Sequence, residues 1–297
     1  MSFFVHGIGT ASPPFRISQA ASVALASKYG STSDEQRRQL RALYRLTRVQ
    51  SRRSVVLDSD NPDGSTTLQF FPPPTDAADR GPTTADRMAR YESDAPPLAA
   101  SAAKAALADA GWAPDSITHV VTVSCTGFAA PSVDVGLMRM LGLRRTVART
   151  HIGFMGCHGA LNGLRAARGY AEASPDARVL VCAVELCSLH FQYGWNPDWL
   201  VSNAIFADGA AAVCGSGLPR AADGAADAEW ALAANGCALL EDSADLMSWR
   251  IGNHGFEMSL SARVPGVIER DLRPWLSDWL AAQGLTVDQI ATWALHP

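Results

Sequence analysis

The sequence of 297 residues lacks the features that mark several large classes of protein. No apolar run approaches the roughly 18 residues that a membrane-spanning helix needs. The first ten residues contain neither the charged region nor the apolar core of a signal peptide. Charged residues make up 18% of the chain and the formal net charge is −4, which gives no general attraction to nucleic acid or anionic membranes. We therefore expect a cytoplasmic protein without a nucleic-acid or membrane partner.

Cysteine is present, but not in the pattern of a metal site. The chain has 6 cysteines, and no CxxC pair or Cys/His cluster has the spacing of zinc ligands. Most of them lie in apolar, strand-like runs, which predicts reduced thiols and no metal. A hydrophobic content of 47% is ample for a large core in one domain or two fused ones.

One cysteine lies where a glycine-rich turn leads into a helix of small residues. Gly153 and Gly156 precede Cys157, and Gly159, Ala160, Gly163, Ala166 and Ala167 follow at near-helical spacing. Glycine permits a sharp turn, and the positive end of a helix dipole lowers the pKa of a thiol. This is the environment of a nucleophilic cysteine. An inert cysteine in a closely packed helix is an equally good interpretation of this stretch alone.

The last residues suggest a partner for that thiol. An apolar run over residues 290–295 ends in His296 and Pro297, which predicts a strand that delivers a histidine and is stopped by proline. A cysteine and a histidine far apart in sequence commonly meet in thiol acyl-transfer enzymes. A histidine in an ordinary loop is the better interpretation of His-Pro alone, and only the pairing with Cys157 favours catalysis.

Hydrophobic patterns predict alternating strands and helices, which indicates an α/β layered fold with buried sheets. The expected strands are 3–8, 119–125, 178–185, 208–213, 230–240 and 247–258. The expected helices are 18–28, 34–48, 84–110, 131–141 and 263–283, besides the one that follows Cys157. Pro96 and Pro97 predict a break in the third of these. Residues 58–82 predict a long excursion, and residues 221–228 mark the best internal boundary.

Five sequence blocks resemble the type III polyketide synthases, the chalcone and stilbene synthase family, and its bacterial members in particular. In family order they are SCTGFAAPSVDVGL from Ser124, GFMGCHGALNGLRAA from Gly153, LVSNAIFADGAAAV from Leu200, VPG from Val264 and WALHP from Trp293. The resemblance covers nearly the whole chain. It implies a thiolase-like αβαβα layered sandwich. Residues 1–220 would be the half that carries the cysteine, and residues 221–297 a partial second half that carries the histidine.

The resemblance also implies a reaction. Cys157 would take an acyl group from acyl-CoA, and His296 would pair with the thiolate and hydrogen-bond the thioester oxygen. Malonyl-CoA would lose CO2 to give an enolate that attacks the bound acyl group, and repetition would build a chain that cyclises. No metal or bound cofactor is implied. Acyl-CoA and malonyl-CoA would be the substrates, and a homodimer is expected.

Further site residues follow from the same resemblance. Phe206 matches the gatekeeper between the CoA tunnel and the cavity, although a core aromatic before a turn is the alternative. Cys125, Cys187, His190 and Met258 occupy cavity-lining positions. Plant enzymes typically have phenylalanine in place of Met258 and methionine in place of Ala130. We therefore expect a cavity of different shape that accepts aliphatic starters.

Arginines between residues 37 and 53 form a candidate site for the phosphates of coenzyme A. Arg41, Arg45 and Arg48 share one helical face by their spacing. We assign phosphate binding to Arg45, Arg48 and Arg52, because the family carries basic residues in this region. A solvated helix face is the competing interpretation.

One family feature is missing. The third catalytic residue is an asparagine in a glycine- and serine-rich loop well past the histidine, and this chain stops one residue after His296. We expect a truncated chain, decarboxylation slowed by about 10²–10³-fold, and an exposed sheet edge that a partner could complete. Two other functions stay open. One is a ketoacyl-ACP synthase III-like condensing enzyme, and the other is a non-catalytic relative that binds acyl-CoA or a full-length partner.

Overall fold

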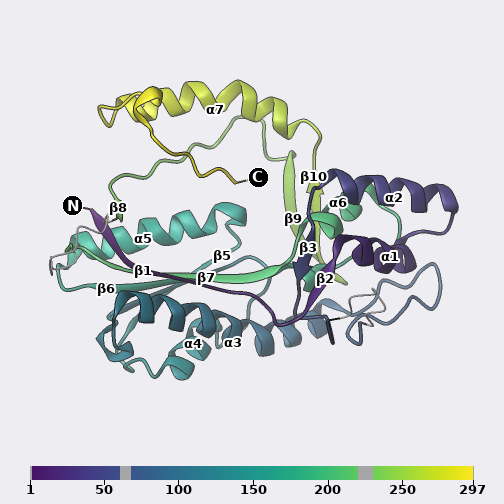
Figure 1. The fold of residues 1–297 in the computed structure, drawn as a ribbon, viewed down its shortest axis with the longest axis horizontal. Coiled ribbons are helices and arrows are strands. Elements are labelled where there is room, and N and C mark those ends of the chain that lie inside the picture. The colour runs from purple at the N-terminus through teal and green to yellow at the C-terminus, as the bar shows by residue number, and fades with distance from the viewer. Residues whose placement is uncertain (1, 61–67, 220–229, 297) are drawn as a thin grey trace.

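A mixed six-stranded sheet forms the centre of the molecule. The computed structural model describes residues 2–60, 68–219 and 230–296 (Figure 1). The strand order is β5 (Ala148–Gly153), β4 (His119–Ser124), β6 (Arg178–Leu186), β7 (Asp208–Ser216), β1 (Phe3–Ala11) and β8 (Trp230–Leu232). β5, β4 and β6 run parallel, whereas β7, β1 and β8 each run antiparallel to their neighbours. The carboxyl ends of β4, β5 and β6 therefore meet at one edge of the sheet.

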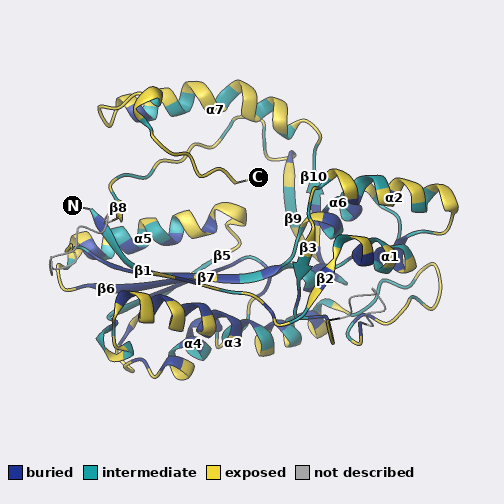
Figure 2. Ribbon diagram, in the orientation of Figure 1, coloured by how far each residue is buried: buried dark blue, intermediate teal, exposed yellow. Residues whose placement is uncertain are grey.

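Helices cover both faces of the sheet, which confirms the expected α/β layers. α5 (Gly159–Ala173) lies on one face, and α3 (Thr84–Ala110) and α4 (Val133–Leu141) lie on the other (Figure 1). Figure 2 shows that the strands between these helices are mostly buried. α3 approaches β1 closely, because a Cβ on Gly9 would lie 2.2 Å from the carbonyl oxygen of Ala102.

The expected break of α3 at Pro96 and Pro97 is wrong, because the helix runs unbroken through both prolines. Thr83 and Asp86 form a capping box at its start, and Gly111 ends it with a φ of 66°. The second half of α3 buries a row of alanines against the sheet: Ala95, Ala99, Ala102, Ala103 and Ala106. This burial outweighs the two amide donors that the prolines remove.

A second group of helices stands beside the sheet. α1 (Gln19–Gly30), α2 (Asp34–Leu46) and α6 (Pro197–Ile205) pack through a small buried core: Ala26, Leu40, Tyr44, Leu200 and Ala204. β2 (Arg16–Ser18) and β3 (Ser51–Arg53) pair next to them. Ser18 accepts a hydrogen bond from the amide of Ala21 and thereby caps the start of α1.

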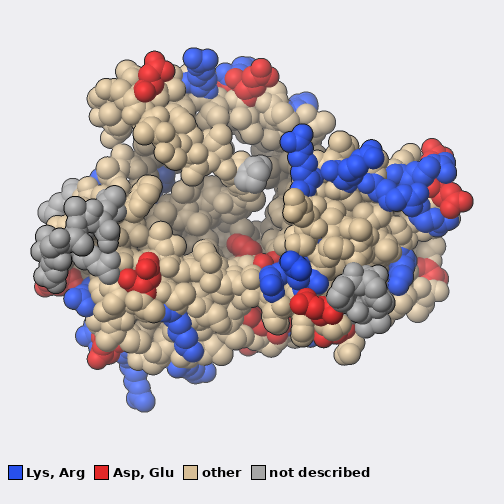
Figure 3. Space-filling view, in the orientation of Figure 1, with Lys and Arg blue, Asp and Glu red and all other residues tan. Residues whose placement is uncertain are grey.

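The chain after residue 230 departs further from expectation. β8 ends at Leu232, although the strand was expected to continue to residue 240. The expected strand over residues 247–258 is a hairpin of β9 (Met247–Gly252) and β10 (Gly255–Leu260). α7 (Val264–Ala281) follows as expected. The short 3₁₀ turns η1 (Pro114–Ser116) and η4 (Val287–Gln289) complete the connections outside the site. Figure 3 shows a hollow between α7 and the sheet.

Two expectations lie outside the described residues. The boundary between residues 220 and 221 belongs to the segment 220–229, and residues 61–67 of the long excursion are likewise not described. Among the described helices, none is long and apolar enough to cross a membrane.

Candidate active site

Cys157 lies in the turn that joins the sheet to α5. It belongs to the 3₁₀ turn η2 (Gly156–His158), which follows β5 and leads directly into α5. Gly156 has a φ of 66°, which favours glycine. A Cβ on Gly159 would lie 2.9 Å from the Val123 side chain, so the small residue lets α5 approach the sheet. The expected turn and small-residue helix are confirmed, and Cys157 as a whole residue is exposed.

The thiol faces a cavity of about 340 Å³, which we call the thiol cavity. Its lining comes from the ends of β4, β5 and β6, from the end of α6 and from the β9–β10 hairpin: Cys125, Thr126, Phe154, Gly156, Cys157, Glu185, Cys187, Phe206, Met247, Ser248, Trp249 and Met258. The structure thus brings Cys157 together with four residues that the sequence singled out, namely Cys125, Cys187, Phe206 and Met258. Ala130 is exposed and is not among the residues lining this cavity.

Glu185 is the main residue that sequence reasoning missed. Its carboxylate accepts hydrogen bonds from the amides of Cys125 and Thr126 at 2.9–3.0 Å, and from the Thr126 hydroxyl at 2.6 Å. The thiol of Cys125 also donates to it at 3.4 Å. The sequence could have indicated it, because Glu185 is an acidic residue at the end of an apolar strand. Ligand and catalytic sites commonly form at the carboxyl ends of parallel strands.

The pKa of the Cys157 thiol is raised above its usual value, by desolvation and then by the nearby negative charge of Glu185. The expectation that a helix N-terminus lowers this pKa is therefore wrong for this conformation. Desolvation and Glu185 also raise the pKa of Cys125 to about 12. At neutral pH both thiols stay largely protonated unless a cation or a hydrogen-bond donor joins them.

Phe206 lies directly after α6, with its backbone held by Arg52. The Arg52 guanidinium donates to the carbonyls of Asn203 and Ala204 at 2.6 Å and of Phe206 at 3.3 Å. It also donates to the Gln19 side chain at 2.6 Å. These acceptors are the free carbonyls at a helix end, which need such donors. Arg52 therefore caps α6 and is part of the protein interior.

The other two arginines assigned to coenzyme A are exposed. Arg45 lies on α2, and Arg48 follows the helix with a φ of 56°. Figure 3 shows basic side chains gathered over α2. The structure thus separates Arg45 and Arg48, which face solvent, from Arg52, which does not.

His190 lies beside the thiol cavity but is not part of its lining. It ends the turn η3 (Cys187–His190), and its Nδ1 accepts from the amide of Phe256 at 2.9 Å. Nε2 must then carry the proton that it donates to the carbonyl of Thr126 at 2.7 Å. Burial lowers the pKa of this imidazole to about 3, so it is neutral at physiological pH. We conclude that His190 links the end of β4 to β10.

His296 is exposed and is not among the residues that line the thiol cavity. The expected strand over residues 290–296 is absent, because no described strand pairs with this segment. The tail runs back below α7 (Figure 1). Across residues 2–60, 68–219 and 230–296, no cluster of His, Cys, Asp and Glu could hold a metal ion.

Comparisons with known proteins point to one family. The family model described as chalcone and stilbene synthases, N-terminal domain, matches residues 3–218. The α-pyrone synthesis polyketide synthase-like Pks18 of Mycobacterium tuberculosis is 29% identical over 99% of this chain and 71% of its own length. The 1,3,6,8-tetrahydroxynaphthalene synthase of Streptomyces peucetius is 38% identical over 67% of this chain and 52% of its own. The crystal structure of PKS-I from the brown alga Ectocarpus siliculosus is 30% identical, with a TM-score of 0.88 over 98% of this chain and 76% of its own.

Proposed function

This chain belongs to the chalcone and stilbene synthase family of type III polyketide synthases, and from that premise we propose which of its residues carry the reaction. Membership confirms the expected acyltransferase class and the thiolase-like fold. It favours polyketide condensation over the carrier-protein-dependent enzyme and over the non-catalytic relative that the sequence had left open.

Cys157 is the nucleophile of the proposed reaction. The observation that carries this assignment is its thiol at the thiol cavity, with Phe206 and Met258 in the same wall. The thiolate attacks the thioester carbonyl of an acyl-CoA, the bond between that carbonyl carbon and the CoA sulfur breaks, and CoA leaves as a thiolate that takes up a proton. The acyl group then remains as a thioester on Cys157.

Malonyl-CoA supplies the extension units. Loss of its carboxylate as CO2 leaves an enolate, whose carbon attacks the carbonyl bound to Cys157, and the Cys157 thiolate departs. The product is a CoA thioester longer by two carbons, which can load again before it cyclises. No metal or bound cofactor takes part in the proposed reaction. The thiol cavity, which is lined by both polar and apolar side chains, holds the growing chain between steps.

His296 is the proposed partner of the thiolate, as the family resemblance implies. A donor is needed here, because desolvation and Glu185 both raise the pKa of Cys157. In the described conformation His296 is exposed. The partnership therefore requires the segment 290–296 to reach the thiol cavity.

The remaining assignments concern binding and assembly. Arg45 and Arg48 receive the phosphates of coenzyme A, since both are exposed and lie at the basic face of α2. Arg52 is withdrawn from that role, because its guanidinium caps α6. The chain acts as a homodimer in the cytoplasm, where its 6 free cysteines would stay reduced.

Intact-protein mass spectrometry after incubation with a panel of acyl-CoAs tests the nucleophile. We expect one acyl adduct that peptide mapping places on Cys157 and that Cys157→Ala abolishes. Cys237→Ala is the matched control, because Cys237 is also an exposed free thiol but is not among the residues lining the thiol cavity. A folded protein that forms no adduct, or forms it equally well in Cys157→Ala, would remove Cys157 from its role.

A further inference from the structure

A cavity at the opposite end of the sheet from Cys157 has no role in the proposed reaction. It has a volume of about 520 Å³, and we call it the basal cavity. Arg178 begins β6 and Ser216 ends β7 at this cavity, and the two residues are partners in the ladder between these strands. Glu185, near the other end of β6, lines the thiol cavity, and the rise of an extended strand places it roughly 23 Å from Arg178. The two cavities are therefore separate sites.

The wall of the basal cavity is partly aromatic and apolar. The guanidinium of Arg178 lies over the Trp112 ring at 5.0 Å from its centre, and the imidazole of His6 lies 4.8 Å from the same indole. The other apolar residues of the lining are Ala110, Pro175, Ala177, Leu218 and Pro219. An indole with a guanidinium over it suits a ligand with a planar ring, because such a ring can stack on either group.

Two of the polar side chains at the basal cavity are engaged within the protein. The Nε2 of His6 lies 2.9 Å from the Ser216 hydroxyl and 3.0 Å from the carbonyl oxygen of Leu218. The Ser216 hydroxyl donates to that carbonyl at 3.0 Å. Asp176 and Arg178 differ from them, because across residues 2–60, 68–219 and 230–296 neither side chain has a hydrogen-bond or ion-pair partner. Both residues are exposed, so their charged groups remain available to a ligand.

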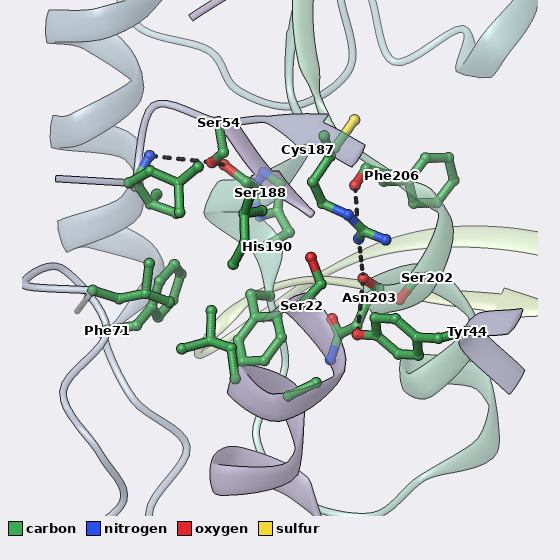
Figure 4. Close-up of a pocket in the computed structure, with 18 of the residues that line it drawn as sticks. Ser22, Tyr44, Ser54, Phe71, Cys187, Ser188, His190, Ser202, Asn203 and Phe206 are labelled. Carbon is green, nitrogen blue, oxygen red and sulfur yellow. Dashed lines mark hydrogen bonds between the residues drawn. The ribbon is translucent and has the colours of Figure 1, made fainter. Parts of the chain in front are cut away.

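Arg52 shows what an engaged arginine in a cavity wall looks like. In the cavity of Figure 4 its guanidinium donates to the carbonyls of Asn203 and Phe206, so its donors are used within the protein. The donors of Arg178 remain open, and a guanidinium presents them in a planar fork that matches a carboxylate. Asp176 can accept from a hydroxyl group, and its negative charge disfavours a second negative charge on the ligand.

We propose that the basal cavity binds a small aromatic monocarboxylate that carries a hydroxyl group. The carboxylate pairs with the guanidinium of Arg178, the ring stacks at Trp112, and the hydroxyl donates to Asp176. This binding is independent of acyl transfer, because the basal cavity shares no lining residue with the thiol cavity.

Isothermal titration calorimetry with 4-hydroxybenzoate tests the site. Three further probes each remove one feature: benzoate lacks the hydroxyl, 4-hydroxybenzamide lacks the charge, and 4-hydroxycyclohexanecarboxylate lacks the planar ring. We expect 4-hydroxybenzoate to bind most tightly, with benzoate weaker by about threefold or more and the amide by about tenfold or more, because each loses a hydrogen bond to a charged side chain. Equal affinities for all four probes, or no binding of 4-hydroxybenzoate in the millimolar range, would overturn the proposal.

Two variants of the charged residues separate direct contact from damage to the fold. Arg178→Met should weaken the binding of both 4-hydroxybenzoate and benzoate by about tenfold or more. Asp176→Ala should remove the preference for 4-hydroxybenzoate and leave benzoate binding at least as tight as in the wild type. A damaged fold would not produce that second result. Arg145→Met, at an exposed arginine outside the basal cavity, is the matched control and should change neither affinity. If either Arg178→Met or Asp176→Ala keeps the affinities of the wild type, the proposal is wrong.

Protein alkylated at Cys157 with iodoacetamide distinguishes this site from the thiol cavity. We expect the affinity for 4-hydroxybenzoate to stay unchanged after alkylation. Binding that is lost on alkylation but unaffected by Arg178→Met would place the probe in the thiol cavity and refute the proposal. A failure of Cys157 to take up an acyl group concerns the proposed function alone, because the alkylated protein cannot be acylated there and should still bind the probe.

Discussion

Desolvation raises the pKa of the thiols of Cys125 and Cys157, and the nearby charge of Glu185 raises it further. Its negative charge raises the pKa of Cys157, so replacing it with neutral glutamine should lower that pKa and increase the thiolate fraction. We expect Glu185→Gln to speed alkylation of Cys157 by iodoacetamide at pH 7.5 about threefold or more. Peptide mapping over a series of reaction times gives the rate for Cys157 apart from the other cysteines.

The pH profile supplies the control for this prediction. In the wild type the alkylation rate should keep rising between pH 7 and pH 9, because the pKa lies above its usual value. Glu185→Gln should shift that profile toward lower pH, so that each rate is reached at a lower pH than in the wild type. Glu172→Gln removes a carboxylate that pairs with Arg168 in α5, and it should leave both the rate and the pH profile unchanged. A slower reaction in Glu185→Gln would show that Glu185 acts through structure and not through charge.

His190 should make the protein sensitive to acid. Its pKa is about 3 in the folded protein against an ordinary 6.5, so the folded state resists protonation. The stability that this provides is complete above pH 6.5 and is lost as the pH falls toward 3. Between pH 7 and pH 5 the loss amounts to about 2 kcal/mol of unfolding free energy. Urea denaturation at both pH values measures it.

His190→Gln removes the titrating group and keeps an amide near the position of Nε2. We expect a lower stability at pH 7, but a difference between pH 7 and pH 5 that is smaller by about 2 kcal/mol than in the wild type. An equal pH difference in both proteins would mean that His190 binds a proton as readily in the folded state as in the unfolded state.

Arg52 should contribute more to the unfolding free energy than the exposed Arg45 does. Arg52→Met leaves buried carbonyls at the end of α6 without donors, which costs about 2–4 kcal/mol of unfolding free energy. Arg45→Met, at an exposed position of α2, should change it by less than about 0.5 kcal/mol. Equal effects of the two substitutions would contradict the capping role.

At the scale of elements, local signals in the sequence located most helices and strands but not their contacts. Gly111 and Gly142 ended α3 and α4 as expected, because each adopts a positive φ that favours glycine. The break predicted from Pro96 and Pro97 was wrong, because burial of α3 against the sheet stabilises the helix through both prolines. β5 and the β9–β10 turn were missed, since half-exposed strands carry weak hydrophobic patterns.

The contact between α3 and β1 depends on glycine in β1. Gly9→Ala would place a Cβ 2.3 Å from the amide nitrogen of Ala106, so the helix and strand would have to separate. Overpacking of this kind costs about 1–3 kcal/mol or more of unfolding free energy. Thermal and urea denaturation should show a marked loss of stability.

Gly169→Ala is the matched control. Gly169 lies in α5 with open space around its Cα, so an added Cβ would meet no atom within 4 Å. Alanine is the better helix former by about 1 kcal/mol, so this variant should be slightly more stable than the wild type. If Gly9→Ala lowers the unfolding free energy and Gly169→Ala raises it, the loss in Gly9→Ala comes from the contact between α3 and β1.

At the scale of the whole molecule, the sequence predicted which residues meet at the thiol cavity, but it did not predict the charge state of the thiol there. Family motifs around Cys157 and Phe206 identified residues that do meet at one cavity. The charge state of Cys157 could not be predicted from its helix position, because its pKa depends on desolvation in the folded protein and then on Glu185 from β6.

His296 is the point where the family pattern and the fold disagree, so it supplies the decisive variant for the molecule as a whole. In the described conformation the imidazole is exposed and does not line the thiol cavity. Because the proposed partnership requires the segment 290–296 to reach the cavity and stabilise the thiolate, His296→Ala should slow the alkylation of Cys157 at pH 7.5 by about tenfold or more. A change of less than about twofold would instead mean that the imidazole stays exposed, and would remove His296 from its role. Because alkylation requires neither malonyl-CoA nor condensation, it measures this partnership separately from every later step of the reaction.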